Sequence, residues 1–253
     1  MSTSSRRIRT MHGWLLILCL GIIGCPVATR AQGVAVATHV DLIKPGTETP
    51  QHSDANDFSN VVVWLSPVDK TTPSGVSLAP ASAPRLIQRN KNFEPHLMVV
   101  EVGTVVQFPN KDPFFHNIFS LYDGKPFDLG LYEAGSTRTV RFDRPGVSFL
   151  FCNIHSEMSA VVVAVDTPYY AISDRSGQIR IRDVQPGRYL MHIWYERSKP
   201  EDLQSLNRIV NISSTTRTLP AFQVQPDPNF TWAHKNKYGQ DYVPPPNPEY
   251  QQP

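Results

Sequence analysis

The chain has 253 residues, 40% of them hydrophobic and 18% charged, so it can bury the core of one large or two small domains. Its 23 prolines and 14 glycines indicate many turns and therefore β structure. It has 24 basic and 22 acidic side chains, but four arginines and no acid precede residue 32, so the rest carries a charge of −2. This near-neutral body excludes a typical nucleic-acid-binding protein.

The first 31 residues have the pattern of a secretory signal peptide. Three arginines precede a short apolar run, 14–23, and Thr29 and Ala31 are small residues at positions that a signal peptidase reads. The apolar run is too short for a membrane span. Residues 22–25 also resemble the lipobox of bacterial lipoproteins, so a lipid anchor at Cys25 is the alternative. Both patterns predict a periplasmic or otherwise extracytoplasmic protein.

The cysteines are informative because only one lies in the predicted mature body. Cys19 and Cys25 fall within the signal segment, which leaves Cys152 as a lone thiol. A single Cys forms no internal disulfide. A free thiol in an oxidising compartment needs protection, and either metal ligation or deep burial would provide it.

Strand candidates follow one another along the chain. The first two, 34–43 and 61–68, are separated by a polar loop, and a proline-rich connector, 69–84, comes next. The central part, 85–166, has short candidates between glycine-containing turns and no helical period. The candidates in this part are 97–100, 104–108, 138–142, 147–152 and 159–165.

Beyond residue 166 the chain changes character. Residues 178–182 alternate strictly between polar and apolar, which predicts a strand with one buried face. Further strand candidates are 188–195, 208–212 and 218–224. The tail, 225–253, is rich in proline and has no periodicity, so we expect it to be extended or disordered.

The segment 149–158 carries the chemistry. It places Cys152, His155 and Met158 in one short loop between two apolar strand candidates, and His116 lies upstream in Pro-Phe-Phe-His-Asn. Two imidazoles, a thiolate and a weak thioether are the ligand set of an electron-transfer copper site. The sequence therefore predicts that His116, Cys152, His155 and Met158 bind copper.

Each of these residues also has a structural explanation. Cys152 and Met158 suit an apolar core, and an isolated histidine is more often hydrogen-bonded than metal-bound. We expect Glu157 to be exposed and His96 to have a structural role. The phenylalanines near the first histidine, Phe114, Phe115 and Phe119, are expected to fill the core rather than to form a docking patch.

An ordered series of motifs resembles the cupredoxins, the plastocyanin-like blue copper proteins. The motifs lie at 102–110, 115–117, 127–130, 142–146 and 152–158. The Cys-x2-His-x2-Met spacing is similar to that of amicyanin. The resemblance implies an eight-stranded Greek-key sandwich over residues 85–166, with copper near one end. It also implies that Asn117 braces the thiolate without binding the metal.

The flanking segments carry a second resemblance. Residues 170–179 and 184–189 are similar to carboxypeptidase-regulatory or transthyretin-like β-sandwiches, which normally begin with strands such as 34–43. The resemblance implies a discontinuous outer sandwich, 34–68 with 167–224, into which the cupredoxin is inserted. The whole layout resembles bacterial methylamine-utilisation-like proteins, a likeness that implies no substrate. The expected fold class is all-β.

Two functions follow from this sequence. No catalytic triad, carboxylate pair or phosphate loop stands out, and a four-ligand copper with no open position favours electron transfer over an enzyme. A redox partner protein would then dock near His155. The alternative is a binding module for copper delivery, or for attachment to carbohydrate or the envelope, in which copper does not cycle.

Overall fold

A computed structural model describes residues 33–43, 57–69, 82–121 and 123–242. The predicted signal peptide, the alternative lipid-anchor site at Cys25 and the end of the tail, 243–253, lie outside these residues. Within the described part, no helix is long and apolar enough to cross a membrane.

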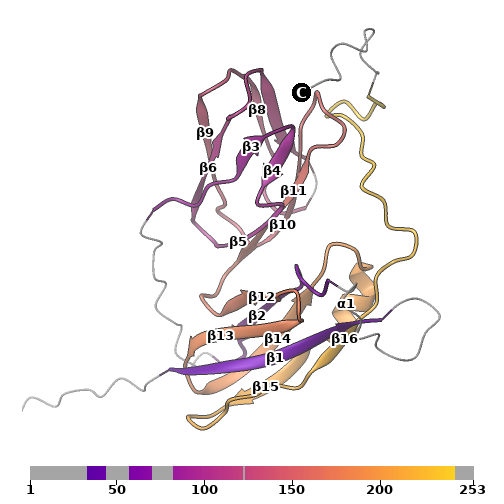
Figure 1. Ribbon diagram of the computed structural model, residues 1–253. Helices are drawn as coiled ribbons and strands as arrows, with labels where there is room; N and C mark the ends of the chain where they lie inside the picture. The colour runs from indigo at the N-terminus through magenta and orange to yellow at the C-terminus, as the bar shows by residue number, and fades with distance from the viewer. Residues whose placement is uncertain (1–32, 44–56, 70–81, 122, 243–253) are drawn as a thin grey trace, which may run out of the picture. The chain divides into compact units, whose positions relative to one another are not determined.

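The all-β prediction is confirmed. Among the described residues there is a single short helix, α1 (Pro200–Leu206). Hydrogen bonding joins the described strands into five sheets, which we group into two sets (Figure 1). Each set encloses a hydrophobic core of its own.

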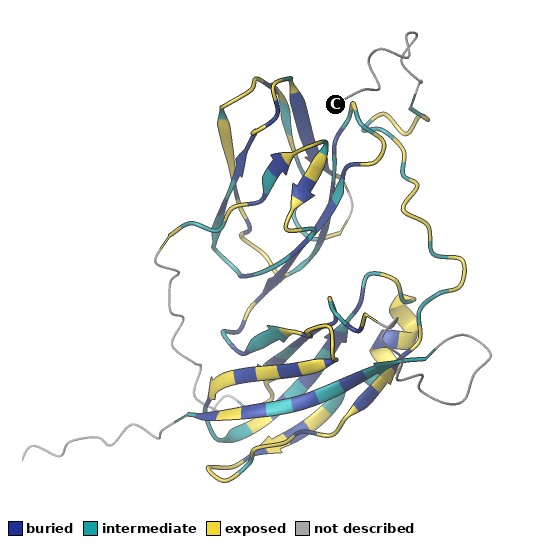
Figure 2. Cartoon of the chain, in the orientation of Figure 1, coloured by how far each residue is buried: buried dark blue, intermediate teal, exposed yellow. Residues whose placement is uncertain are grey.

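The first set of strands comes from both ends of the described chain and forms two sheets, ordered β13-β1-β16 and β12-β2-β14-β15. Its members are β1 (Val34–Leu42), β2 (Val62–Pro67), β12 (Tyr170–Ile172), β13 (Gln178–Val184), β14 (Gly187–Trp194), β15 (Arg208–Ile212) and β16 (Phe222–Val224). Both sheets contribute side chains to one core, so they form a sandwich. Buried and exposed residues alternate along most of β13, as Figure 2 shows, because only one face meets that core.

The second set comes from the middle of the chain. Its members are β3 (Ile87–Arg89), β4 (Asn92–Glu94), β5 (Leu97–Glu101), β6 (Val105–Pro109), β7 (His116–Ser120), β8 (Phe127–Tyr132), β9 (Thr137–Arg141), β10 (Gly146–Phe151) and β11 (Ser159–Val165). The main sheet has the order β5-β11-β10-β7-β8, and β6 pairs with β9 and β3 with β4. Large aromatic residues such as Phe108, Tyr132 and Phe142 fill this core, which also contains Cys152 and Met158.

Strand β11 is buried on both faces. Ala160, Val162 and Ala164 pack in the core of the second set, whereas Val161 and Val163 belong to a third cluster that includes residues of β2 and β14. A strand with both faces buried needs an unbroken apolar sequence, because no position in it faces water. This explains why Ser159–Val165 lacks the alternation seen in β13.

The expected strands were found, but several elements were not foreseen. Strand β7 has five buried residues, yet His116, Asn117 and Ser120 are polar, so its sequence did not indicate a strand. Helix α1 begins with Pro200 and has two acidic residues in its first turn, which are helix-start signals, but it is too short to show a period.

By contacts, the described residues all belong to one compact unit. The division into an inserted sandwich, 85–166, and a discontinuous outer one therefore stays a prediction. The two strand sets are not cleanly separated, because the third cluster of buried residues contains side chains of both.

A pair of alanine substitutions tests whether both faces of β11 are covered. Val162→Ala and Val163→Ala each remove two methyl groups from a side chain at most 1% exposed, so each should lower the free energy of unfolding by about 2 kcal/mol. Urea unfolding measures both values. A near-zero effect of Val163→Ala beside a full effect of Val162→Ala would show that the outer face of β11 meets solvent.

Candidate metal centre

The loop between β10 and β11 holds three of the four predicted ligands. The two strands pair as far as Phe151 and Ser159, so the loop begins and ends at the same rung. Inside the loop, the Cys152 N–H donates to the Met158 carbonyl at 3.2 Å, and the Met158 N–H donates to the His155 carbonyl at 3.2 Å. These two bonds close the loop and hold its potential ligands close together.

The fourth predicted ligand, His116, is the first residue of β7. Strand β7 runs antiparallel to β10, with Phe119 opposite Phe151. The start of β7 therefore lies next to the loop that follows β10. The sheet itself brings together two segments that are far apart in the sequence.

The thiol of Cys152 lies between two imidazoles. Its Sγ is 3.7 Å from Nδ1 of His116 and 3.6 Å from Nδ1 of His155. One ligand atom from each of the three residues lies within 4.8 Å of the others. Bonds of about 2.0 Å to nitrogen and about 2.3 Å to sulfur, at a trigonal angle, separate the two ligand atoms by about 3.7 Å. The spacing of the sulfur and nitrogen atoms thus fits a metal ion in the plane of the three residues.

Asp112 fixes the orientation of His116, a role that the sequence analysis did not predict. Its Oδ2 accepts a hydrogen bond from His116 Nε2 at 2.7 Å, which leaves Nδ1 free to face the thiol. The backbone N–H groups of Asn90 and Lys91 donate to the same carboxylate at 2.6 and 3.0 Å. Burial raises the pKa of Asp112, but these three hydrogen bonds outweigh it, so the pKa lies below its usual value.

Both imidazoles are held in the neutral form that binds metals. Burial lowers the pKa of His116 despite the opposing Asp112 carboxylate. Burial, with the charge of His116, lowers the pKa of His155 to about 4. Burial also raises the pKa of the Cys152 thiol, more than the backbone N–H groups around it lower it. A metal ion that binds here would therefore displace only the thiol proton at neutral pH.

The roles of Met158 and Asn117 stay predictions. Met158 is fully buried at the end of the ligand loop, in the same core as Cys152. The backbone N–H of Asn117 lies close enough to the Cys152 thiol to lower its pKa. Its side-chain Nδ2 instead donates to Asp128 Oδ1 at 2.7 Å.

The surroundings of the cluster are aromatic on one side and open on another. The ring of Phe114 lies 5.2 Å from that of His116 and 5.5 Å from that of His155, centroid to centroid. His155 is only partly buried, and the apolar side chains of Phe115 and Ile154 are 56% and 46% exposed. The expectation that Phe115 fills the core is therefore wrong.

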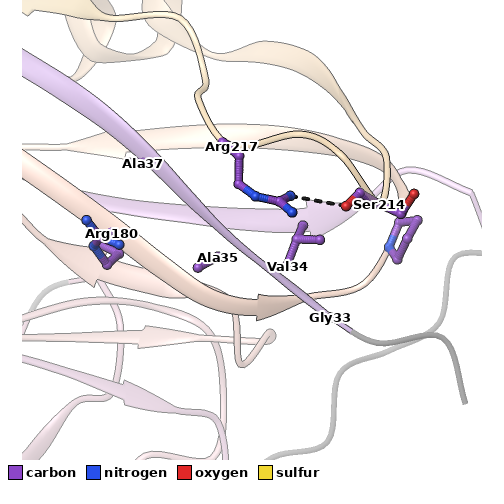
Figure 3. Close-up of a pocket in the computed structure, with 8 residues that line it drawn as sticks. Gly33, Val34, Ala35, Ala37, Arg180, Ser214 and Arg217 are labelled. Atoms are coloured by element: carbon purple, nitrogen blue, oxygen red, sulfur yellow. Dashed lines mark hydrogen bonds between the residues drawn. The ribbon is translucent and has the colours of Figure 1, made fainter.

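The other polar candidates lie apart from this cluster. Glu157 is exposed, as expected, and His96 bonds to the Ser159 carbonyl at 3.1 Å and to Glu196 at 2.7 Å, a structural role. Figure 3 shows a hollow beside β1 into which Arg180 and Arg217 project. The hollow is lined by Gly33, Val34, Ala35, Ala37, Arg180, Pro186, Ser214 and Arg217. None of these residues is a His, Cys or carboxylate, so the hollow offers no such ligand to a metal.

Comparison with known proteins gives matches only among solved structures, since no family model and no curated protein matches the chain. A purple cupredoxin from Nitrosopumilus maritimus is 23% identical with a TM-score of 0.30, over 32% of this chain and 99% of that chain. A copper-containing nitrite reductase from Thermus scotoductus is 21% identical with a TM-score of 0.32, over 37% of this chain and 25% of that chain. A reduced amicyanin mutant is 16% identical with a TM-score of 0.32, over 41% of this chain and 98% of that chain.

These matches cover less than half of the chain, and the argument for a metal centre does not depend on them. It depends on a β-sandwich that places one thiol and two imidazoles within 4.8 Å of one another. The fold and the site define the chain as an all-β protein with a His-Cys-His cluster, in which His116 and Cys152 are buried and His155 is partly buried.

The contact between Asp112 and His116 predicts a loss of metal affinity when the carboxylate is neutralised. Asp112→Asn should weaken metal binding about ten- to hundredfold, because the neutral amide is a weaker acceptor than the carboxylate and orients the His116 ring less firmly. A competition titration with Cu(II) measures the affinity. Asp143→Asn is the matched control, since it removes an exposed aspartate of the same strand set that pairs with Lys125 at 2.7 Å. Equal affinities in the two variants would contradict the role of Asp112.

Proposed function

We propose that this chain is an exported copper protein that transfers single electrons through a site formed by His116, Cys152, His155 and Met158. The observation that carries the proposal is the buried Cys152 Sγ at 3.7 and 3.6 Å from two imidazole Nδ1 atoms. Bound copper would supply a one-electron couple between Cu(I) and Cu(II). Two imidazoles, one thiolate and a weak thioether suit both oxidation states.

The residues favour electron transfer because contacts other than metal bonds restrain them. Cys152 and His116 are fully buried, and each is fixed by the sheet. Asp112 holds one ring, and the closed loop holds the other. A site whose ligands move little between oxidation states exchanges electrons quickly, whereas an enzyme needs an open position for its substrate.

The partner in this proposal docks where His155 approaches the surface. This ring is partly exposed, whereas His116 is not, so the path from the metal to solvent is shortest through His155. Phe115 and Ile154 offer apolar contact area nearby. A small apolar surface suits a transient complex between electron carriers.

Export is part of the proposal on sequence grounds. The charged start, the short apolar run and the small residues Thr29 and Ala31 have the pattern of a secretory signal. The body then has one thiol, Cys152, which burial and metal ligation together would protect from oxidation. The extracytoplasmic location, with a lipid anchor at Cys25 as the alternative, fits this chemistry.

Removal of the thiol tests the proposal directly. The protein loaded with Cu(II) should absorb strongly at about 600 nm through thiolate-to-copper charge transfer, and Cys152→Ser should abolish the band. Glu157→Gln is the matched control, because it changes an exposed residue of the same loop and should keep the band. A colourless protein that takes up Cu(I) reversibly without redox cycling would instead support copper delivery.

Substitution of the predicted axial ligand separates its role from simple core packing. Met158→Leu keeps the volume and apolarity of a fully buried side chain but removes the thioether. The band at about 600 nm should remain, and the reduction potential should rise, because Cu(II) loses a donor that stabilises it. Voltammetry measures the potential. An unchanged potential would show that Met158 only fills the core.

A further inference from the structure

The described part of the tail, residues 225–242, lies against the ligand loop. The Tyr242 hydroxyl donates to the carbonyl of Cys152 at 2.6 Å. The Lys237 N–H donates to Asn153 Oδ1 at 3.0 Å. The ring of His234 stacks on Phe151 with centroids 4.1 Å apart and planes at 28°. The tail therefore contacts three consecutive residues at the point where β10 enters the loop.

A second set of contacts reaches the other side of Cys152. Lys237 Nζ donates to Asp128 Oδ2 at 2.7 Å, and Asp128 Oδ1 accepts from Asn117 Nδ2 at 2.7 Å. The backbone N–H of Asn117 in turn lies close to the Cys152 thiol. One tail lysine is thus linked through two residues to the sulfur, while Tyr242 binds the carbonyl of the same cysteine.

The tail presents these groups in a fixed arrangement. The Asn236 N–H donates to the Gln240 carbonyl at 2.9 Å, and the Gly239 N–H donates to the Asn236 carbonyl at 2.9 Å. Gly239 has a φ of 75°, in the left-handed region that glycine adopts without strain. The His234 Nδ1 lies 3.2 Å from the Tyr242 hydroxyl, so residues 234 and 242 meet across this turn.

The beginning of the tail is also attached. The Asp227 N–H donates to the Arg197 carbonyl at 2.6 Å, and Trp232 meets the ring of His96 edge-on at 5.0 Å. The segment is therefore held at its start and at its turn. A chain fixed at both places loses little further entropy when it contacts the loop.

We propose that residues 225–242 are a built-in brace of the ligand loop, in which Tyr242 and Lys237 are positioning residues for Cys152. The proposal rests on the copper site proposed above, and it goes beyond that site by assigning a role to a segment outside both sandwiches. Hydrogen bonds around a ligand fix its orientation and tune the metal that it binds. The brace sets the torsion of Cys152 through its carbonyl and the field at its sulfur through Asp128 and Asn117.

Two single substitutions in the full chain test the brace against matched controls. Tyr242→Phe removes only the hydroxyl, and Tyr189→Phe removes a hydroxyl that donates to the Gln185 carbonyl at 2.7 Å, in the other strand set. Lys237→Gln removes one partner of a 2.7 Å ion pair, and Lys125→Gln does the same at the 2.7 Å pair with Asp143. Within each pair, both variants lose the same type of bond, but only the first of the two residues lies in the tail that contacts the ligand loop.

The copper-loaded proteins should separate the brace variants from their controls. Tyr242→Phe should release copper to a chelator about tenfold faster than wild type and should change the EPR spectrum, because the orientation of Cys152 is less restrained. Lys237→Gln should shift the reduction potential, since the charge linked to the sulfur is lost. Tyr189→Phe and Lys125→Gln should match wild type in all three measurements. Brace variants that also match wild type would overturn the proposal.

A measurement on the metal-free protein keeps this test independent of copper. The Cys152 and Met158 N–H groups bond within the loop, so their hydrogen exchange reports how tightly the loop is closed. Exchange should be faster in Tyr242→Phe than in Tyr189→Phe, and equal rates would contradict the brace. A wild-type protein without a thiolate band would contradict the copper site. Normal copper spectra in all variants would contradict the brace alone.

Discussion

The pairing of β10 with β11 is the constraint on which the rest of the site depends. Six residue pairs hold the two strands in register up to Phe151 and Ser159. The loop that follows must therefore return within a fixed span, and its backbone hydrogen bonds bring Cys152 and Met158 together. A shift by one residue would reverse the faces of β11 and move the loop relative to His116. The register is protected because both faces of β11 are buried, so a shift would disturb two clusters at once.

Most strands and the ligand loop could be predicted, because the residues that determine each of them lie close together in the sequence. Ser159–Val165 was predicted to the residue, since a fully apolar run between turns indicates a buried strand. Three potential ligands occur within one short loop, so their proximity needed no tertiary information. His116 required more, but the antiparallel return of β7 beside β10 supplied the contact. The types of side chain, two imidazoles, a thiol and a thioether, then favoured copper over other metals without knowledge of any distance.

The remaining features were not predictable because they depend on contacts between segments far apart in the sequence. Asp112 looks like an ordinary turn residue, and only its hydrogen bonds to His116 and to two backbone N–H groups give it a role. The tail has no periodicity, since its contacts with Cys152 and Asn153 come from single residues of an irregular segment. Strand β7 was missed because three of its five buried residues, His116, Asn117 and Ser120, are polar and so break the apolar pattern of a buried strand.

The burial of the Cys152 thiol explains why the site needs contacts from the sheet, the loop and the tail. Without a metal, burial keeps the Cys152 thiol protonated and both imidazoles neutral, so the cluster carries no charge that would force it open. Three neutral groups in one pocket attract one another weakly, and their spacing must come from the scaffold rather than from mutual attraction. The sheet fixes His116, the loop fixes His155, and the tail contacts the carbonyl of Cys152. A site held from three directions has little freedom to rearrange when the charge of a bound ion changes, which is the physical requirement for rapid electron transfer.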